Sequence, residues 1–131
     1  MRKLKGLIIM LSILASLFGM TACSDGGANS YEQITPQEAK TIMDTESEYI
    51  IIDARTTEEF AEGHIADAIL IPEYEIADRA EKELPDKDAL ILVYCRSGRR
   101  SKIASEELVK LGYTNVKEFG GIIDWPYEVV K

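Results

Sequence analysis

A run of seven residues, Cys95–Ser101 (CRSGRRS), combines one thiol with three arginine side chains. It follows the strongest strand signal in the chain and precedes a helical pattern, so its backbone N–H groups can turn inward as an anion cradle. Gly98 allows the tight curl that such a cradle needs. N–H dipoles and nearby arginine charges favour the thiolate form of a cysteine. The run therefore predicts an anion held at a nucleophilic sulfur.

Every member of this run is a candidate site residue. Cys95 is the expected nucleophile, and the expected substrate-binding residues are Arg96, Ser97, Gly98, Arg99, Arg100 and Ser101. The alternative is a buried cysteine that ends an apolar strand and precedes an exposed basic turn, because free cysteine is among the most buried residue types. The arginines, the glycine and the helix start together favour catalysis.

Strands and helices are expected to alternate around this run. Short apolar stretches predict strands over Tyr49–Asp53, Ile69–Ile71, Ala89–Tyr94 and Val116–Phe119. Capping residues and helical spacing predict helices that follow Thr35 and Thr56 and that cover Glu73–Leu84 and Ser101–Leu111. This order indicates an α/β domain with a mainly parallel sheet. Ligands bind beyond the carboxyl ends of such strands, which is where Cys95 falls.

Helix boundaries can be argued from particular residues. Thr35 with Glu38, and Thr56 with Glu59, have the spacing of capping boxes. Gly63 and Gly112 are expected to close the helices that precede them. The residues expected to face inward from the helix over Glu73–Leu84 are Ile76, Ala77, Ala80 and Leu84.

Three blocks of the chain resemble single-domain rhodaneses, the thiosulfate sulfurtransferases. The run Cys95–Ser101 looks like their active-site loop. The upstream block comprises Asp53-Ala54-Arg55, Glu59-Phe60, Gly63-His64-Ile65 and Ala68 through Pro72. The third block is Gly120-Gly121 followed by Trp125, and Asp67 departs from the pattern because a glycine commonly precedes the alanine. The resemblance implies a rhodanese-like α/β fold, with about five mainly parallel strands and helices on both faces.

Sulfur transfer is the activity that the resemblance implies. The Cys95 thiolate would attack the outer sulfur of a small anionic donor such as thiosulfate, and loop N–H groups would stabilise the resulting persulfide. A thiol or cyanide acceptor would then remove the sulfur. Two other functions stay open, a non-catalytic rhodanese-like binding module and a cysteine phosphatase or arsenate reductase. Phosphatases place five residues between Cys and Arg, whereas four separate Cys95 from Arg100, so sulfur transfer is preferred.

Four residues of the upstream block have expected supporting roles. Asp53, Arg55 and Glu59 could form an ion-pair network beneath the site, and Arg55 is also a candidate for reaching the donor. His64 is the only histidine, and the resemblance implies packing and hydrogen bonding for it rather than general-base catalysis. One histidine and one available cysteine give no support for a metal site, and no cofactor is expected.

The first 23 residues predict an export signal rather than part of the fold. A basic head with Arg2, Lys3 and Lys5 precedes the apolar run Gly6–Met20, which is 15 residues long and too short to span a bilayer. The segment Met20-Thr21-Ala22-Cys23 resembles a bacterial lipoprotein box, which implies lipidation of Cys23. An uncleaved signal anchor is the alternative.

The domain boundaries and the location follow from that interpretation. We expect a lipoprotein-type signal peptide over 1–23, a flexible tether over 24–30 and a rhodanese-like domain over 31–131. The protein would be exported and held by a lipid anchor on a bacterial membrane, facing outside the cytoplasm. Without the leader, 12 basic and 23 acidic residues give a net charge of −11, which argues against nucleic acid as a partner. With Cys23 lipidated, Cys95 would have no disulfide partner.

Overall fold

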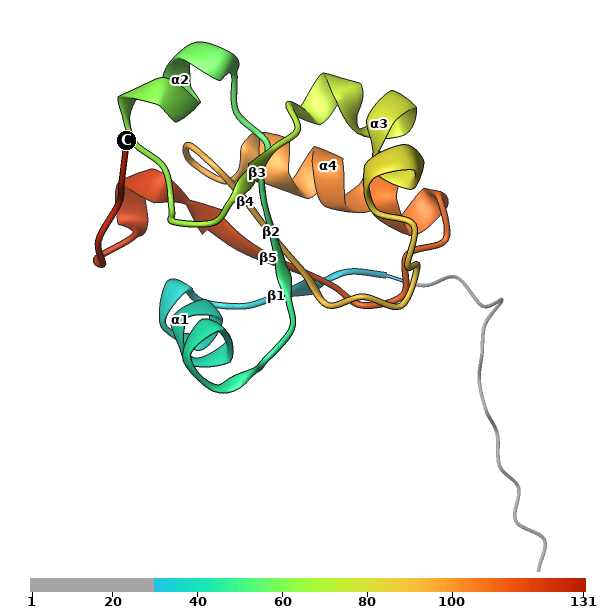
Figure 1. Ribbon diagram of the computed structural model, residues 1–131, viewed down its shortest axis with the longest axis horizontal. Helices are drawn as coiled ribbons and strands as arrows, with labels where there is room; N and C mark the ends of the chain where they lie inside the picture. Colours follow the sequence, from blue (N-terminus) through green and yellow to red (C-terminus); the bar gives the residue numbers. More distant parts are fainter. Residues whose placement is uncertain (1–29) are drawn as a thin grey trace, which may run out of the picture.

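Five parallel strands form the centre of the domain (Figure 1). The structure, a computed structural model, describes residues 30–131. The strands are β1 (Glu32–Gln33), β2 (Ile50–Asp53), β3 (Ile69–Leu70), β4 (Ile91–Cys95) and β5 (Val116–Gly121). Their order across the sheet is β1-β5-β4-β2-β3, and every neighbouring pair is parallel. The predicted α/β fold with a parallel sheet is confirmed.

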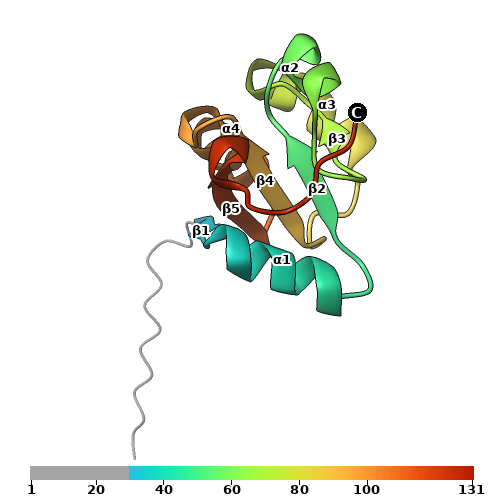
Figure 2. The same cartoon turned by 90° about the vertical axis from the view of Figure 1, so that its left-hand side faces the viewer.

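Helices cover both faces of this sheet. The α-helices are α1 (Pro36–Thr45), α2 (Thr57–Glu62), α3 (Ile76–Glu83) and α4 (Arg99–Lys110), and the short 3-10 helices are η1 (Glu73–Glu75) and η2 (Ile122–Asp124). Helices α3 and α4 lie on one face and α1 lies on the other (Figure 2). Helix α2 follows the carboxyl end of β2.

The central strand β4 contributes to a hydrophobic core on each face. Successive side chains of a strand point to opposite faces, so Ile91, Val93 and Cys95 belong to the core with α3 and α4. Leu92 and Tyr94 belong to the core with α1. The strand is buried along its whole length, as expected for a central parallel strand. Cys95 consequently faces α4.

Both predicted capping boxes are present. The Thr35 Oγ1 accepts a hydrogen bond from the Glu38 N–H at 3.0 Å, and the Glu38 carboxylate accepts one from the Thr35 N–H at 2.9 Å. Thr56 and Glu59 make the same pair of bonds at the start of α2, at 3.2 and 3.0 Å. Each box satisfies N–H groups that a helix start leaves without intrahelical acceptors. Gly63 follows the last residue of α2, as predicted.

The secondary structure differs from the prediction in several places. The sequence did not indicate β1, because its two residues are polar and exposed and their place in the sheet comes from pairing with Lys117 and Glu118 of β5. The predicted helix over Glu73–Leu84 is divided into η1 and α3. Ile76, Ala80 and Leu84 are buried as predicted, but Ala77 is exposed. The inward face of α3 is therefore narrower than the spacing suggested.

Helix α4 begins at Arg99, two residues before the predicted start. Gly98 occupies its N-cap position with φ 110°, in the left-handed region that glycine adopts readily. The chain therefore turns from the strand into the helix within Arg96–Gly98, and Ser101 lies in the first helical turn. This early start matters for the site because it places more N–H groups near Cys95.

The expected signal peptide, the lipidation site Cys23 and all of the expected tether except Ser30 lie outside the described residues. Within 30–131, none of the helices has both the length and the apolar character to cross a membrane.

Candidate active site

Cys95 lies at the carboxyl end of β4, with its thiol held at the start of α4. Its side chain is buried, at 1% exposure. The Gly98 N–H donates a hydrogen bond to the Cys95 Sγ at 3.0 Å, and the Ser101 Oγ lies 3.4 Å from the same sulfur. A backbone N–H pointing at sulfur stabilises negative charge there. The loop therefore has the geometry of a cradle for a thiolate or for an anion bound to it.

The amino end of α4 adds to this field. The first N–H groups of a helix lack intrahelical acceptors, and the helix dipole places partial positive charge at this end. Arg99, Arg100 and Ser101 are the first three residues of α4. Their N–H groups stand in the turn that directly follows Gly98. The positive end of this helix therefore favours negative charge on the Cys95 sulfur.

Gly121 allows the loop to pass against β5. It is the register partner of Cys95, and a Cβ added to it would lie 2.0 Å from the Arg96 carbonyl oxygen and 2.5 Å from the Ser97 Cα. Both are backbone atoms that cannot move independently of the loop. The Ile123 N–H also donates to that Arg96 oxygen at 3.2 Å. Gly121 of the third block therefore allows the loop to lie directly against β5.

The three arginines of the loop are not equivalent. Arg100 makes a two-pronged ion pair with the Glu59 carboxylate, with N–O distances of 2.8 and 3.0 Å. This hydrogen bonding lowers the pKa of Glu59 to about 2. Arg96 and Arg99 are exposed, and neither forms an ion pair with any residue of 30–131. They are the two arginines left free to meet an incoming anion.

The single network expected for Asp53, Arg55 and Glu59 is divided into two separate pairs. Glu59 binds Arg100 on the loop side, whereas Arg55 binds Asp53, with N–O distances of 2.7 and 2.9 Å. Arg55 is 5% exposed and also donates to the Gly63 carbonyl at 2.7 Å. The prediction of one network is wrong because neighbouring positions in the sequence belong to different elements. Arg55, a candidate for reaching the donor, is held in a buried ion pair.

Tyr94 completes the Asp53 pair, and sequence reasoning missed it. Its hydroxyl donates to the Asp53 carboxylate at 2.6 Å and accepts the Ile65 N–H at 3.0 Å. Burial, and then the adjacent Asp53 charge, raises the pKa of Tyr94 well above its ordinary value, so it stays a donor. Tyr94 faces the α1 core, opposite to Cys95. This cluster supports the sheet and does not enter the cradle.

His64 packs at the end of α2. Its ring stacks on Phe60 with centroids 3.7 Å apart, and its Nδ1 is 2.9 Å from the Phe60 carbonyl oxygen. Its backbone pairs with Val130 of the C-terminal segment. This is a packing and hydrogen-bonding position. No contact between His64 and Cys95 occurs among the hydrogen bonds of the described residues.

Glu118 is a second residue that sequence reasoning missed. It is 2% exposed on β5, and its carboxylate accepts hydrogen bonds from the Ser101 hydroxyl and from the Gly120 N–H, the latter at 2.9 Å. One signal was available, because Glu118 shares the alternation of Val116, and the Val116 face of the predicted strand Val116–Phe119 is expected to be buried. A carboxylate in such a strand is seldom buried without a reason.

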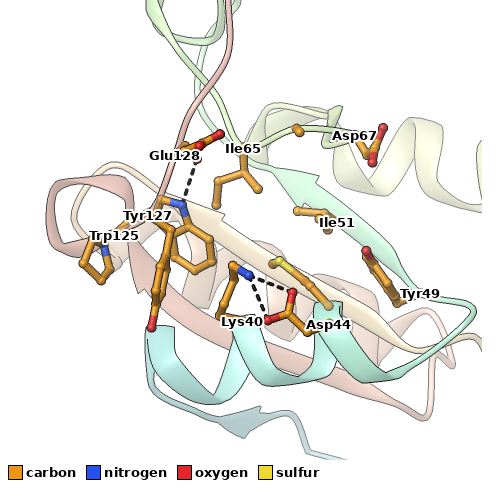
Figure 3. Close-up of a pocket in the computed structure, with 12 residues that line it drawn as sticks. Lys40, Asp44, Tyr49, Ile51, Ile65, Asp67, Trp125, Tyr127 and Glu128 are labelled. Atoms are coloured by element: carbon orange, nitrogen blue, oxygen red, sulfur yellow. Dashed lines mark hydrogen bonds and ion pairs between the residues drawn. The ribbon is translucent and has the colours of Figure 1, made fainter.

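A hollow of about 740 Å³ lies elsewhere, between α1 and the C-terminal segment (Figure 3). Lys40 and Asp44 of α1 stand on one side of it, and Trp125, Tyr127 and Glu128 stand on the other. Lys40 is bound to Asp44 at 2.7 Å, and none of the residues Cys95–Ser101 lines the hollow. The volume of a hollow therefore does not identify the end of the domain at which Cys95 lies.

The fold and the cradle together define a class of single-domain proteins with a cysteine at the end of a central parallel strand. Residues 35–126 match the family model described as Rhodanese-like domain. The chain belongs to the rhodanese-like family, so the family that the sequence resemblance indicated is confirmed.

Curated relatives include named sulfurtransferases. The chain is 40% identical over 80 residues to the thiosulfate sulfurtransferase PspE of Escherichia coli, covering 61% of this chain and 77% of that protein. It is 42% identical over 85 residues to a sulfurtransferase of Allochromatium vinosum, covering 64% and 77%. A longer relative is the adenylyltransferase and sulfurtransferase UBA4 of Candida albicans, 34% identical over 104 residues; the match covers 74% of this chain and only 24% of that protein.

Solved structures show the same fold. A rhodanese with anions from E. coli matches with a TM-score of 0.60 and 38% identity, covering 63% of this chain and 98% of that one. The solution structure of a rhodanese-like domain from Anabaena sp. matches with a TM-score of 0.70 and 26% identity, covering 75% and 77%.

Proposed function

We propose that the protein is a sulfurtransferase that carries sulfane sulfur on Cys95. The observation that carries the proposal is the Gly98 N–H donated to the Cys95 Sγ at 3.0 Å, at the amino end of α4. In the first half-reaction the Cys95 thiolate attacks the outer sulfur of thiosulfate. A new S–S bond forms, the S–S bond of thiosulfate breaks, and its electron pair leaves with sulfite. The product is a Cys95 persulfide anion.

The second half-reaction returns the enzyme to its starting state. A nucleophilic acceptor, a thiolate or cyanide, attacks the outer sulfur of the persulfide, and the electron pair of the broken S–S bond returns to Cys95. Loop N–H groups around the terminal sulfur of the persulfide support both steps, because that sulfur carries the negative charge after the first step and before the second. Exposed Arg96 and Arg99 would bind the anionic end of the donor.

Sulfur transfer is preferred over phosphate chemistry on the loop itself. Four residues separate Cys95 from Arg100, and Arg100 is engaged with Glu59 at 2.8 Å. A phosphatase needs that arginine to grip the phosphoryl oxygens. The loop is also pressed against Gly121, where no room exists even for a methyl group. We therefore expect negligible hydrolysis of aryl phosphates.

The proposal is tested by steady-state assay of thiosulfate with cyanide, following thiocyanate formation by the full-length chain in detergent. Wild type is expected to turn over, Cys95→Ser to be inactive, and the exposed-site control Lys110→Ala to keep wild-type rates. Binding of a protein partner without turnover on any sulfane-sulfur donor would instead support the non-catalytic binding module. Turnover of Cys95→Ser at the wild-type rate would contradict the proposal.

We further propose that the chain is exported and lipid-anchored through Cys23. The support is the basic head, the short apolar run and the lipoprotein-like box of the leader. Expression in a bacterium with radiolabelled palmitate should label wild type and leave Cys23→Ala unlabelled. Equal labelling of both variants, or recovery of wild type from the cytoplasm with its first residues intact, would reject the anchor.

A further inference from the structure

The buried carboxylate of Glu118 has no part in the sulfur chemistry described so far. Its side chain projects from β5 to the α4 face of the sheet, the face on which Cys95 lies. Within residues 30–131 it forms no ion pair. Burial of a carboxylate without a cation is unfavourable unless hydrogen bonds or protonation compensate. The position of this carboxylate beside the Cys95 thiol therefore needs a physical explanation.

Ser101 connects this carboxylate to the thiol. The Ser101 Oγ is fully buried, donates to Glu118 Oε2, and lies 3.4 Å from the Cys95 Sγ. The Gly120 N–H donates to the same Glu118 oxygen at 2.9 Å and holds it in place. The carbonyl oxygens of Gly98 and Gly120, 3.1 and 3.4 Å from the Ser101 Oγ, are further acceptors for the hydroxyl hydrogen. The Cys95 sulfur, the Ser101 hydroxyl and the Glu118 carboxylate thus form a continuous hydrogen-bonded chain.

We propose that Glu118 stores the proton that Cys95 releases, with Ser101 as the relay. The S–H bond of Cys95 breaks and its proton passes to the Ser101 Oγ, while the proton already on Ser101 passes to Glu118 Oε2. The three groups then comprise a thiolate, a hydroxyl and a carboxylic acid. Their net charge stays at one negative throughout. When the thiolate is released at the end of the cycle, the same two transfers run in reverse.

The arrangement suits a thiol that must meet a dianion, and in this respect the inference rests on the proposed function. With the proton on Glu118, the cradle holds one negative charge instead of two when thiosulfate arrives. The same holds while Cys95 carries a persulfide. Two like charges this close would disfavour the second ionisation. Glu118 acts through Ser101 and touches neither donor nor acceptor, so it is a positioning and proton-storing residue.

A hollow of about 350 Å³ borders the loop and β5. Gly98, Gly120 and Glu118 contribute to its wall, which gives the stored proton a route for exchange with water. The other charged or titratable groups around the set are Tyr31, Glu59, Arg96, Arg99, Arg100, Lys102, Glu106 and Asp124. The change in the pH dependence of Cys95 alkylation caused by substituting Glu118 must therefore exceed the change caused by substituting one of these groups.

The first test is the pH dependence of Cys95 alkylation, which needs no sulfur transfer. The rate of iodoacetamide modification at Cys95 is followed by peptide mass spectrometry in the full-length chain, with wild type compared to Glu118→Gln. Loss of the shared proton takes the wild-type set from one negative charge to two, and the variant from none to one. The pH midpoint should therefore fall by about one unit or more in Glu118→Gln.

The control is Glu106→Gln, which removes the same charge from an exposed position of α4. Glu106 and Glu118 both influence Tyr31, so this control lies in the same part of the domain. Water screens it, and its alkylation midpoint should stay within about 0.2 units of wild type. An unmoved or higher midpoint in folded Glu118→Gln would overturn the inference.

The second test detects the stored proton directly. Infrared difference spectra between the sulfur-loaded and resting protein should show a carboxylic-acid C=O band in wild type and none in Glu118→Gln. Ser101→Ala leaves Glu118 in place but removes the relay, so its band should be absent as well. A wild type that takes up sulfur without this band, or a Ser101→Ala variant that keeps it, contradicts the inference. If no donor loads wild type, the proposed function fails and the alkylation midpoint alone decides the role of Glu118.

Discussion

Two buried carboxylates lie on opposite faces of one sheet, and their surroundings differ in kind. Asp53 is fully buried and paired with Arg55 at 2.7 Å, with the Tyr94 hydroxyl as a further donor. Glu118 is 2% exposed, and its partners are a serine hydroxyl and a backbone N–H. The first carboxylate is neutralised by a cation. The second carboxylate forms hydrogen bonds but no ion pair within residues 30–131.

A buried carboxylate that is paired with a cation supports the fold, whereas one without a cation can take part in proton transfer. The Asp53 carboxylate is bound by the Arg55 guanidinium and by the Tyr94 hydroxyl, and this cluster supports the α1 face. Among residues 30–131 Glu118 has no cationic partner, and one hydroxyl separates it from the Cys95 Sγ. The same sheet thus presents a structural face and a reactive face, separated by the alternation of side chains along β4.

Substitution of the two carboxylates should change the free energy of unfolding by very different amounts. Asp53→Asn leaves Arg55 as a buried charge without its partner and should lower the free energy of unfolding by about 3–5 kcal/mol. Glu118→Gln removes a buried charge that has no cation, and should change it by no more than about 1 kcal/mol. Urea unfolding measures both. Equal losses in the two variants would break the distinction between the faces.

A slightly smaller effect is expected where β5 supports the loop. Gly121→Ala places a methyl group against the backbone of Arg96 and Ser97, so the loop must move and activity should fall by about a hundredfold. The matched control is Gly112→Ala, which also imposes strain because its φ is 103° but meets only the end of Lys87. That variant should lose stability and keep kcat/KM. Similar activity in both variants would show that the loop does not depend on Gly121.

The Glu59–Arg100 pair should contribute a pH-dependent stability of about 1 kcal/mol. The pKa of Glu59 is about 2 in the folded protein against an ordinary value of 4.5. The unfolded chain therefore binds more protons within that interval, so the contribution is complete above about pH 4.5 and disappears as the pH falls to about 2. Unfolding of wild type and Glu59→Gln, compared across this range, should show the two curves converging. A constant gap would contradict the role of the pair.

The smallest effect concerns donor binding. Arg99 is exposed, so Arg99→Glu should raise the apparent KM for thiosulfate by roughly three- to tenfold at low salt, with less effect at high salt. Lys110→Glu, the same charge change at the last residue of α4, is the control and should leave KM unchanged. An Arg99→Glu variant with wild-type KM at low salt would remove this arginine from the donor site.

Local signals predicted the fold well because they are encoded over short distances. Both capping boxes, the buried strand β4 and the α/β order come from residues within one element. The strand β1 was not predicted, because its two polar residues are ordered only by pairing with β5 across the fold. Ala77 was placed wrongly because the spacing suggested a wider apolar face than the sheet covers.

The residues of the candidate loop could be predicted from the sequence, but the partners of their side chains could not. The Cys95–Ser101 run carried its own motif, whereas the partners of its side chains come from distant elements. Arg100 meets Glu59 across 41 positions, and Ser101 meets Glu118 across 17. Pairing at such separations depends on strand order and register, which a single sequence does not reveal. This is why the expected Asp53–Arg55–Glu59 network resolved into two pairs.

Sulfur carried on Cys95 would be detected by intact-mass spectrometry. The full-length chain is incubated with thiosulfate, desalted and measured without reductant, alongside Cys95→Ser. Wild type should gain about 32 Da, the mass of one sulfur atom in a persulfide, localised to the peptide of Cys95 and removed by cyanide, while Cys95→Ser stays unchanged. A wild-type chain that gains no mass from thiosulfate or any other sulfane-sulfur donor would contradict the account.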